Sequence, residues 1–325
     1  MKIKFIFFAL FIITENIFGS CGSSSCPLFI SNPTTKGYFS IGLSYEYIYQ
    51  NQVYVGTNKS FVGAIPEDHD EVSTLNQTTA ITLGYAAFDF LRFDLSVPFI
   101  HREHSHIYND PDGKEWEHWN YSGLGDVFIT GSFSVISGND NTLSLGLNAG
   151  VKIPTGITDA KNNAGEVAEV TIQPGTGSTD FIIGVSIADN LFSVPQLSGD
   201  EYSAFPLALI VNYKMNGKGT DDYKFGNELQ LHLSTAYRFV DKISLLLQVN
   251  ARFQAHADVG NTDEPEENTG GKWVFLSPGL KFYLSDDISL YGFLQLPVYQ
   301  NVNGIQQTAP YNLRIGINKE INILD

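Results

Sequence analysis

Four of the seven histidines lie in one short stretch, HREHSHIYNDPDGKEWEHWNY, which runs from His101 to Tyr121. The four are His101, His104, His106 and His118. Five carboxylates are interleaved with them, and three imidazoles together with a carboxylate such as Glu103 or Glu117 would suit Zn²⁺ or Cu²⁺. This stretch is the chain's best candidate for metal chemistry.

The spacing of these histidines leaves two interpretations open. His104 and His106 share one face of an extended chain, and a turn at 109–113 would bring His118 back across them. However, the spacing matches no tight metal motif, and a mobile loop holds ligands poorly in advance of the metal. A weak metal site without catalysis and a plain solvated loop are both consistent with the pattern.

Most of the chain alternates apolar and other residues with a period of two, as strands do. In YFSIGLSYEYIY, for example, Phe39 and Ile41 share one face, while Ser40 and Ser44 share the other. Each such segment has about the ten residues that a tilted strand needs to cross a bilayer, and no apolar run has the roughly eighteen that a transmembrane helix needs. The segments are 37–49, 76–88, 91–101, 125–136, 142–154, 179–188, 205–215, 225–239, 243–255, 273–284, 288–299 and 311–321.

The connections between these segments alternate in length. Those at 89–90, 137–141, 240–242 and 285–287 are short, and those at 50–75, 102–124, 155–178 and 256–272 are long. The connection 189–204 is long where a short turn is expected. The rhythm is that of an outer-membrane barrel with short periplasmic turns and long outer loops. We therefore predict an all-β fold over 37–325, a single closed antiparallel transmembrane β-barrel of about 12 strands.

A soluble β-sandwich would also alternate, but its core would have to bury charged side chains at high cost. In a barrel these side chains face a wet or salt-bridged lumen. The predicted lumen-lining residues are Arg92, Asp94, Lys152, Glu228, Gln230, His232, Arg252 and Arg314. The same alternation predicts a lipid-facing position for Phe39, Leu95, Leu145, Leu231 and Phe282.

An enzyme is a further possibility, because outer-membrane phospholipases are also twelve-stranded barrels. Such an enzyme needs its serine and histidine on the lipid-facing side, whereas alternation puts His232 and Ser234 in the lumen beside Gln230. No Gly-x-Ser-x-Gly elbow is present. His232 is better interpreted as a lumen hydrogen-bonding group, so no catalysis and no cofactor are predicted, apart from the weak Zn²⁺ or Cu²⁺ site.

The net charge of −16 excludes nucleic acid as a partner, because phosphate binding needs clustered Lys and Arg. With both termini in the periplasm, the predicted outer loops hold 19 of the 35 acidic residues. Divalent cations that bridge lipopolysaccharide could bind at this rim, and simple solubility of a wet loop surface explains the charge equally well. The predicted surroundings are the lipid and lipopolysaccharide of a Gram-negative outer membrane.

The first 20 residues are typical of an export signal. Lys2 and Lys4 form a basic start, and the apolar stretch from Phe5 to Ile13 is too short to span a bilayer. We predict a signal peptide at 1–20 and a periplasmic segment at 21–36. Cys21 follows a loose lipoprotein cleavage box and could carry lipid, or it could form a disulfide with Cys26 after export.

Three stretches resemble the outer-membrane transporter family named after the meta-cleavage pathway of phenol degradation. They are GLGDVFITGSF (Gly123–Phe133), GLNAGVKIPTG (Gly146–Gly156) and QPGTGSTDFIIGVS (Gln173–Ser186). VGAIPEDHDEV, from Val62 to Val72, is similar to an outer-loop motif of a histidine-containing branch of that group. The resemblance implies a channel-type barrel, in some cases linked to uptake of small hydrophobic compounds, and it implies no enzyme.

Two functions follow as alternatives. The first is a passive or gated pore for small solutes, with hydrophobic ones included. The second is a surface protein that captures divalent metal with acidic, histidine-bearing loops and uses the barrel as an anchor. Conductance across a planar bilayer distinguishes them, because only the first predicts stepwise currents.

Overall fold

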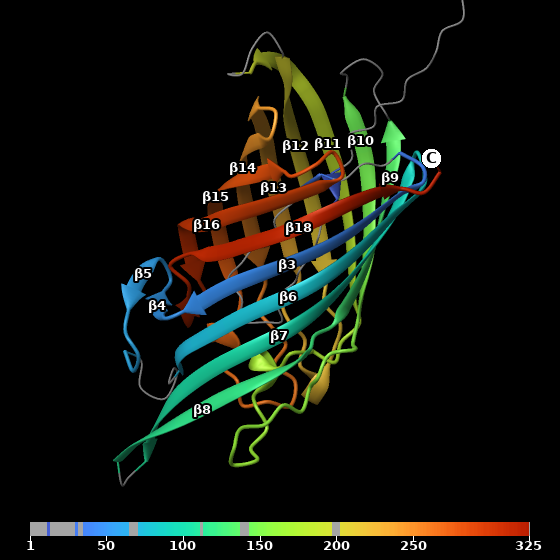
Figure 1. Ribbon diagram of the computed structural model, residues 1–325. Helices are drawn as coiled ribbons and strands as arrows, with labels where there is room; N and C mark the ends of the chain where they lie inside the picture. Colours follow the sequence, from blue (N-terminus) through green and yellow to red (C-terminus); the bar gives the residue numbers. More distant parts are fainter. Residues whose placement is uncertain are drawn as a thin grey trace, which may run out of the picture.

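A computed structural model of the chain describes residues 12–13, 30–31, 35–64, 71–110, 113–136, 143–196 and 202–324 (Figure 1). Cys21 and Cys26 lie outside these residues, as does most of the predicted signal peptide, so the choice between lipid and disulfide stays a prediction. Most of the described residues lie in strands. In the described part of the chain, no helix is long and apolar enough to cross a membrane.

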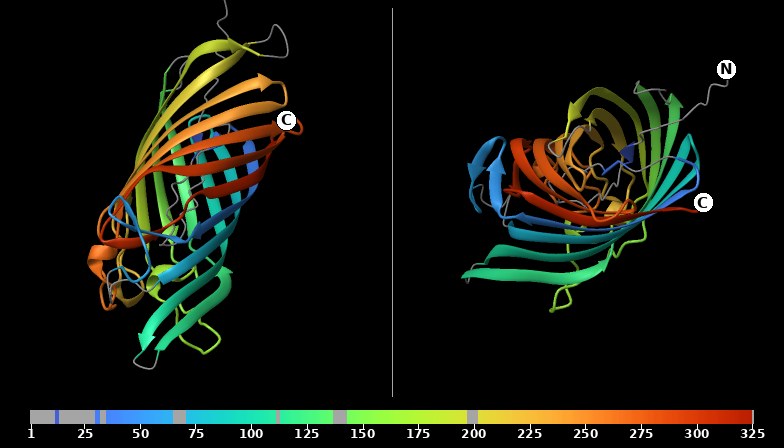
Figure 2. Two further views of the ribbon diagram at one scale, coloured as in Figure 1. Left: turned by 90° about the vertical axis from the view of Figure 1, so that its left-hand side faces the viewer. Right: turned by 45° about the horizontal axis from the view of Figure 1, so that its top comes forward.

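Twelve antiparallel strands form a closed barrel, because β18 pairs with β3, β3 with β6, β6 with β7 and β7 with β9 (Figures 1 and 2). The predicted transmembrane barrel is therefore confirmed. Its strands are β3 (Tyr38–Gln50), β6 (Glu71–Phe88), β7 (Leu91–Asp110), β9 (Val127–Ile136), β10 (Ser144–Ile153), β11 (Asp180–Pro195), β12 (Tyr202–Met215), β13 (Glu228–Val240), β14 (Ile243–Gln254), β15 (Gly271–Tyr283), β16 (Ile288–Val302) and β18 (Asn312–Asn322).

The remaining elements are not among the twelve strands of the barrel. β8 (Gly113–Leu124) pairs with β7, β4 (Gln52–Val55) lies between β5 (Asn58–Ser60) and β17 (Ile305–Thr308), and β1 (Ile12–Ile13) pairs with β2 (Ile30–Ser31). Three short 3₁₀ helices belong to the long loops. They are η1 (Val170–Ile172), η2 (Thr220–Asp222) and η3 (Glu266–Asn268).

Two segments that were predicted to be loops are mostly β-strand in the structure. Segment 102–124 is a β7–β8 hairpin rather than an open loop, since alternation continues through His101–His106 and β7 pairs there with β6 on one side and β8 on the other. Connection 189–204 is also mostly strand, because β11 continues to Pro195 and β12 begins at Tyr202. The connection is therefore short, and the alternation of short and long connections holds.

The two faces of the wall differ in polarity. In β13, Leu229 and Leu233 are exposed on the outer face, while Gln230 and His232 are buried on the inner face. The outer face of the other strands carries the same apolar surface, which suits the hydrocarbon of a bilayer. Because side chains alternate across a strand, one polar lumen and one apolar belt follow from a single sequence pattern.

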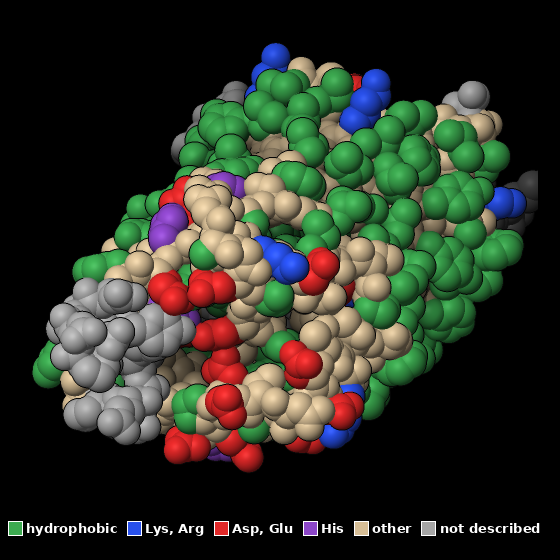
Figure 3. All heavy atoms as spheres, turned by 90° about the horizontal axis from the view of Figure 1, so that it is seen from below, with side chains coloured by type: hydrophobic (Ala, Val, Ile, Leu, Met, Phe, Trp, Pro, Cys, Tyr) green, Lys and Arg blue, Asp and Glu red, His purple; other side chains and the backbone are tan. Residues whose placement is uncertain are grey.

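The long loops gather at one end of the barrel, opposite the end that holds the short turns and Leu324 (Figures 1 and 2). Viewed from the loop end, acidic side chains form a broad patch (Figure 3). The described acids of loops 154–179, 216–227 and 255–270 are Asp159, Glu166, Glu169, Asp221, Asp222, Asp258, Asp263, Glu264, Glu266 and Glu267. Val170 packs among Tyr223, Phe225 and Ala257, so the three loops contact one another.

Candidate functional site

The eight residues predicted to line the lumen are all buried in the structure, with exposed fractions of 8% or less. Seven of them fall into three groups along the inner wall. Arg92 and Asp94 lie toward the short-turn end of β7, Lys152 lies at the loop end of β10, and Glu228, Gln230, His232 and Arg252 lie on the inner face of β13 and β14. Arg314 of β18 lies directly across the strand pair from Glu46 of β3.

The Arg92 group is held by charge-assisted hydrogen bonds. The Arg92 Nη2 atom lies 2.9 Å from Asp94 Oδ1 and donates to Ser40 Oγ at 2.5 Å, while Arg92 Nε is 3.1 Å from the same Asp94 oxygen. Gly84 makes room for this pair, since a Cβ at this position would lie 1.7 Å from Arg92 Nη2. The ion pair therefore requires a glycine on β6.

A second group crosses β13, β14 and β15. The Arg252 Nε atom lies 3.3 Å from Glu228 Oε2, and the Arg252 guanidinium stacks 4.9 Å from the centre of the Trp273 ring. Gln230 Nε2 donates to the same Glu228 oxygen at 3.0 Å. These contacts fix an arginine and a carboxylate against the lumen wall.

His232 belongs to a separate hydrogen-bonded chain. Its Nδ1 lies 2.9 Å from Asn250 Oδ1, and Asn250 Nδ2 donates to Ser277 Oγ at 3.0 Å. Asn250 is also the direct cross-strand partner of His232, which explains why the ring is held there. The histidine thus hydrogen-bonds within the wall, on the face opposite to the one that an outer-membrane phospholipase would use.

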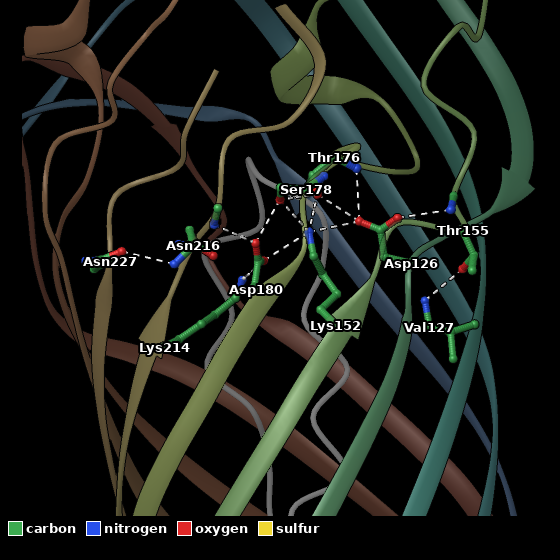
Figure 4. Close-up of polar contacts among 12 residues, drawn as sticks. Asp126, Val127, Lys152, Thr155, Thr176, Ser178, Asp180, Lys214, Asn216 and Asn227 are labelled. Atoms are coloured by element: carbon green, nitrogen blue, oxygen red, sulfur yellow. Dashed lines mark hydrogen bonds and ion pairs between the residues drawn. The ribbon is translucent and has the colours of Figure 1, made fainter. Parts of the chain in front are cut away.

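The third group lies at the loop end and is centred on Lys152 (Figure 4). The Lys152 Nζ atom lies 2.9 Å from Asp126 Oδ2 and 3.0 Å from Asp180 Oδ2, and all three side chains are buried. Lys152 Nζ also donates hydrogen bonds to Thr176 Oγ1 and Ser178 Oγ. A second cation is close by, since Lys214 Nζ lies 3.4 Å from Asp180 Oδ2. We call Asp126, Lys152, Thr176, Ser178 and Asp180 the rim cluster.

The rim cluster fixes the backbone of the outer loops. The two Asp126 oxygens accept from the amides of Gly156 and Thr176, each at 3.0 Å, and Asp180 Oδ1 accepts from the amide of Gly217 at 3.0 Å. Gly156 and Gly175 lie so close that a Cβ on Gly175 would be 2.5 Å from the Gly156 carbonyl carbon. Glycine at both positions lets loop 154–179 enter and leave the barrel at one point.

The three stretches that carry the family resemblance converge on this cluster, since Asp126, Lys152 and Thr176 each belong to a different one. Sequence reasoning identified Lys152 and missed both aspartates. The signal was available, because Asp126 directly precedes β9, Asp180 is the first residue of β11, and a glycine lies one to three residues before each. Their shared contact with Lys152 arises because β9, β10 and β11 are neighbours in the barrel, and the spacing in the sequence does not reveal it.

The four histidines of the opening stretch are divided between the two faces of the hairpin. His104 and His106 are buried on the inner face, at 1% exposure each, and Glu71 of β6 lies beside them. His101 and His118 lie on the outer face, where they contact Ser122 at 2.8 Å and Ser105 at 2.9 Å. The expectation that His118 joins His104 and His106 is wrong, because His118 lies opposite Ser105 and odd and even positions of a strand point in opposite directions.

The two carboxylates proposed as companions of these histidines are also divided. Glu103 lies on the outer face, with its Oε1 3.5 Å from His101 Nε2. Glu117 of β8 and Glu71 of β6 are the cross-strand partners of His106, one on each side, so both share its inner face. Sequence reasoning missed Glu71 because it placed 50–75 in a loop.

Comparison with protein families gives a match over residues 49–315 to the family described as "Putative MetA-pathway of phenol degradation". The chain belongs to this family. Comparison with curated proteins finds no match. The family assignment agrees with the resemblance of the three stretches at the rim cluster.

Among solved structures, the fold is similar to an outer membrane channel from Pseudomonas putida F1, with a TM-score of 0.60, 14% identity, and coverage of 88% of this chain and 96% of that one. The NanC porin matches with a TM-score of 0.47, 9% identity, and coverage of 86% and 100%. A FadL homologue from Pseudomonas aeruginosa matches with a TM-score of 0.41, 10% identity, and coverage of 98% and 100%. At 14% identity, the likeness to the Pseudomonas putida channel establishes the fold alone. The closed barrel and its apolar outer face identify the chain as an outer-membrane protein of the Gram-negative type.

Proposed function

We propose that the protein is an outer-membrane channel that passes small solutes through the barrel interior. The observation that carries this proposal is a set of buried polar atoms on the inner wall that have no hydrogen-bond partner within the described residues. They are Ser44 Oγ, Thr82 Oγ1, Ser96 Oγ, Asn148 Nδ2, Asn212 Nδ2 and Oδ1, Gln230 Oε1 and Asn312 Oδ1.

These atoms support the proposal because an unpaired polar group in a dry interior costs about 1–3 kcal/mol. They come from seven different strands around the barrel, so no single local distortion accounts for them. Water molecules inside the barrel would satisfy all of them at once. A hydrated lumen that runs from the loop end to the short-turn end of the barrel would form a pore.

The charge of the lumen bears on the solute. Among the described residues, six buried Lys or Arg side chains stand against five buried Asp or Glu side chains, so the wall is nearly neutral. Such a wall attracts neither anions nor cations strongly, unlike a pore lined by charge of one sign. Small solutes without a large net charge fit it best, and the family description makes phenol-like compounds the first class to examine.

Two further observations favour a channel over a passive anchor. The fold is similar to that of an outer membrane channel from Pseudomonas putida F1. The inner wall also holds fixed charged groups such as the Glu228–Arg252 pair, which an anchor without a pore would have no need to keep buried at such cost. Both observations support a route through the barrel interior.

Single-channel recording in a planar bilayer tests the proposal. Stepwise open-channel currents are expected for the wild type, and Arg252→Ala is expected to change the unitary conductance because Arg252 lies on the lumen wall. Lys272→Ala is the matched control, since Lys272 is exposed on the outer face of the adjacent strand. Swelling of proteoliposomes in sugars of increasing size then gives the size limit. A folded barrel that inserts and remains silent would contradict the proposal.

A further inference from the structure

The inner face of the β6–β7–β8 wall carries a group of metal-ligating side chains at the loop end of the barrel. One ligand atom from each of Glu71, His104 and His106 lies within 4.8 Å of the other two. A fourth candidate comes from the loop above them, because Glu169 Oε1 is 3.8 Å from His106 Nδ1. Two imidazoles and two carboxylates therefore meet from two strands and one loop.

We propose that Glu71, His104 and His106 bind a divalent transition-metal ion such as Zn²⁺, with Glu169 as the fourth ligand. This site goes beyond the channel function and does not depend on it. Two neutral imidazoles and two carboxylates are a ligand set that such ions accept in tetrahedral geometry. The two carboxylates also balance the double charge of the ion beside two buried imidazoles.

The local strand register explains why these side chains meet. His104 and His106 are two residues apart on β7, so they share a face, and their ring centres lie 4.2 Å apart. Glu71 is the direct cross-strand partner of His106 on β6. A bound ion with bonds of about 2.0–2.1 Å needs its ligand atoms about 3.3 Å apart, which small side-chain rotations from this arrangement supply.

The hydrogen bonding of His104 selects the tautomer that a metal requires. The Thr74 hydroxyl donates to Gln307 Oε1 at 2.9 Å, and its oxygen lies 2.7 Å from His104 Nδ1. Because the hydroxyl proton is directed to Gln307, Thr74 accepts the Nδ1–H of His104. The Nε2 atom of His104 then carries the lone pair, and Thr74 orients the ring as an outer-shell partner does in known metal sites.

The surroundings shield the two histidines of the site from bulk water, whereas Glu71 is half-buried and the Glu169 side chain is 37% exposed. Trp119 of β8 packs against both rings, with its centre 5.0 Å from that of His106 and 6.0 Å from that of His104. The same tryptophan packs against Ala168 and Ile172 of the loop that carries Glu169. A bound ion would therefore join loop 154–179 to the barrel wall beside the lumen entrance.

The test is calorimetric titration of Zn²⁺ into the folded, metal-stripped barrel in detergent. His104→Ala and His106→Ala are expected to weaken Zn²⁺ binding by more than about 100-fold, and Thr74→Ala by about 10–100-fold. His101→Ala and His118→Ala are the matched controls, because these residues are on the outer face of the same hairpin; their affinity is expected to equal that of the wild type. Folding of each variant is checked by its heat-dependent migration on a gel.

Two further measurements keep the proposal falsifiable if a histidine variant does not fold. Glu71→Gln and Glu169→Gln are expected to weaken Zn²⁺ binding, and Co²⁺ in the wild type is expected to give the visible spectrum of a tetrahedral site. Equal Zn²⁺ affinity in all variants, or a loss confined to His101→Ala and His118→Ala, would overturn the proposal. Because binding is measured without any current, a silent barrel that binds Zn²⁺ would refute the channel and leave the metal site standing.

Discussion

The polar groups of the rim cluster and those elsewhere on the lumen wall are equally buried but differently satisfied. Around Lys152, the carboxylates of Asp126 and Asp180 accept several hydrogen bonds each. On the lumen wall of β12, both side-chain polar atoms of Asn212 have no partner within the described residues. The difference indicates two roles, since the rim cluster holds the outer loops in place, whereas the proposed function assigns the partners of groups such as Asn212 to water.

Removal of the rim cation should give the largest loss of stability. In Lys152→Met two buried carboxylates lose the cation that they share, which should lower the free energy of unfolding by about 3–5 kcal/mol. Lys218→Met is the matched control, because Lys218 is half-exposed and lies 3.4 Å from Asp258 at the same end. The control should cost less than about 1 kcal/mol. Urea unfolding in lipid vesicles measures the free energy of unfolding of both variants. Equal losses would contradict a structural role for the rim cluster.

The outer face of the wall gives the next largest effect. Leu231→Arg puts a charge on the lipid-facing side of β13 and should cost about 2–4 kcal/mol if it lies near the midplane of the membrane. Gln230→Arg, one residue away, points into the lumen and should cost much less, because water and Glu228 are within its reach. The same unfolding assay compares them. If both variants are equally stable, the assignment of the two faces is wrong.

Within the lumen, bonded and unbonded amides should differ by a smaller amount. Asn250→Ala removes the partner of both His232 and Ser277 and should cost about 1–3 kcal/mol. Asn212→Ala removes no hydrogen bond to any described residue and should cost less than about 1 kcal/mol. A large loss for Asn212→Ala would show that this amide has a structural partner and that this part of the lumen wall resembles the rim cluster.

The alternation of the sequence was enough to predict the barrel, because each strand obeys it locally. The segment predicted at 37–49 is strand β3 at Tyr38–Gln50, and the predicted inward positions such as Gln230 and Arg314 are buried. Local pattern also separates His101 from His104 by parity, although grouping by sequence proximity alone put them together. In these cases the information lies within one strand.

Contacts between distant segments could not be predicted in this way. Asp126 and Asp180 meet at Lys152 only because β9, β10 and β11 are neighbours that end at the same rim. Glu71 meets His106 because β6 starts earlier than its alternation suggested, so the strand register and not the spacing makes the pair. Both sites depend on how strands are aligned, which the period of two leaves undetermined.

Thiol accessibility during conductance recording tests the central claim most directly. In a background with Cys21 and Cys26 replaced by serine, Asn212→Cys places a thiol on the inner wall, and Val211→Cys places one on the outer face of the same strand. A charged, water-soluble thiol reagent should react with the Asn212→Cys variant and reduce its current, and it should leave the Val211→Cys variant unchanged. Absence of reaction at position 212, or equal reaction at both positions, would contradict a water-filled pore through this barrel.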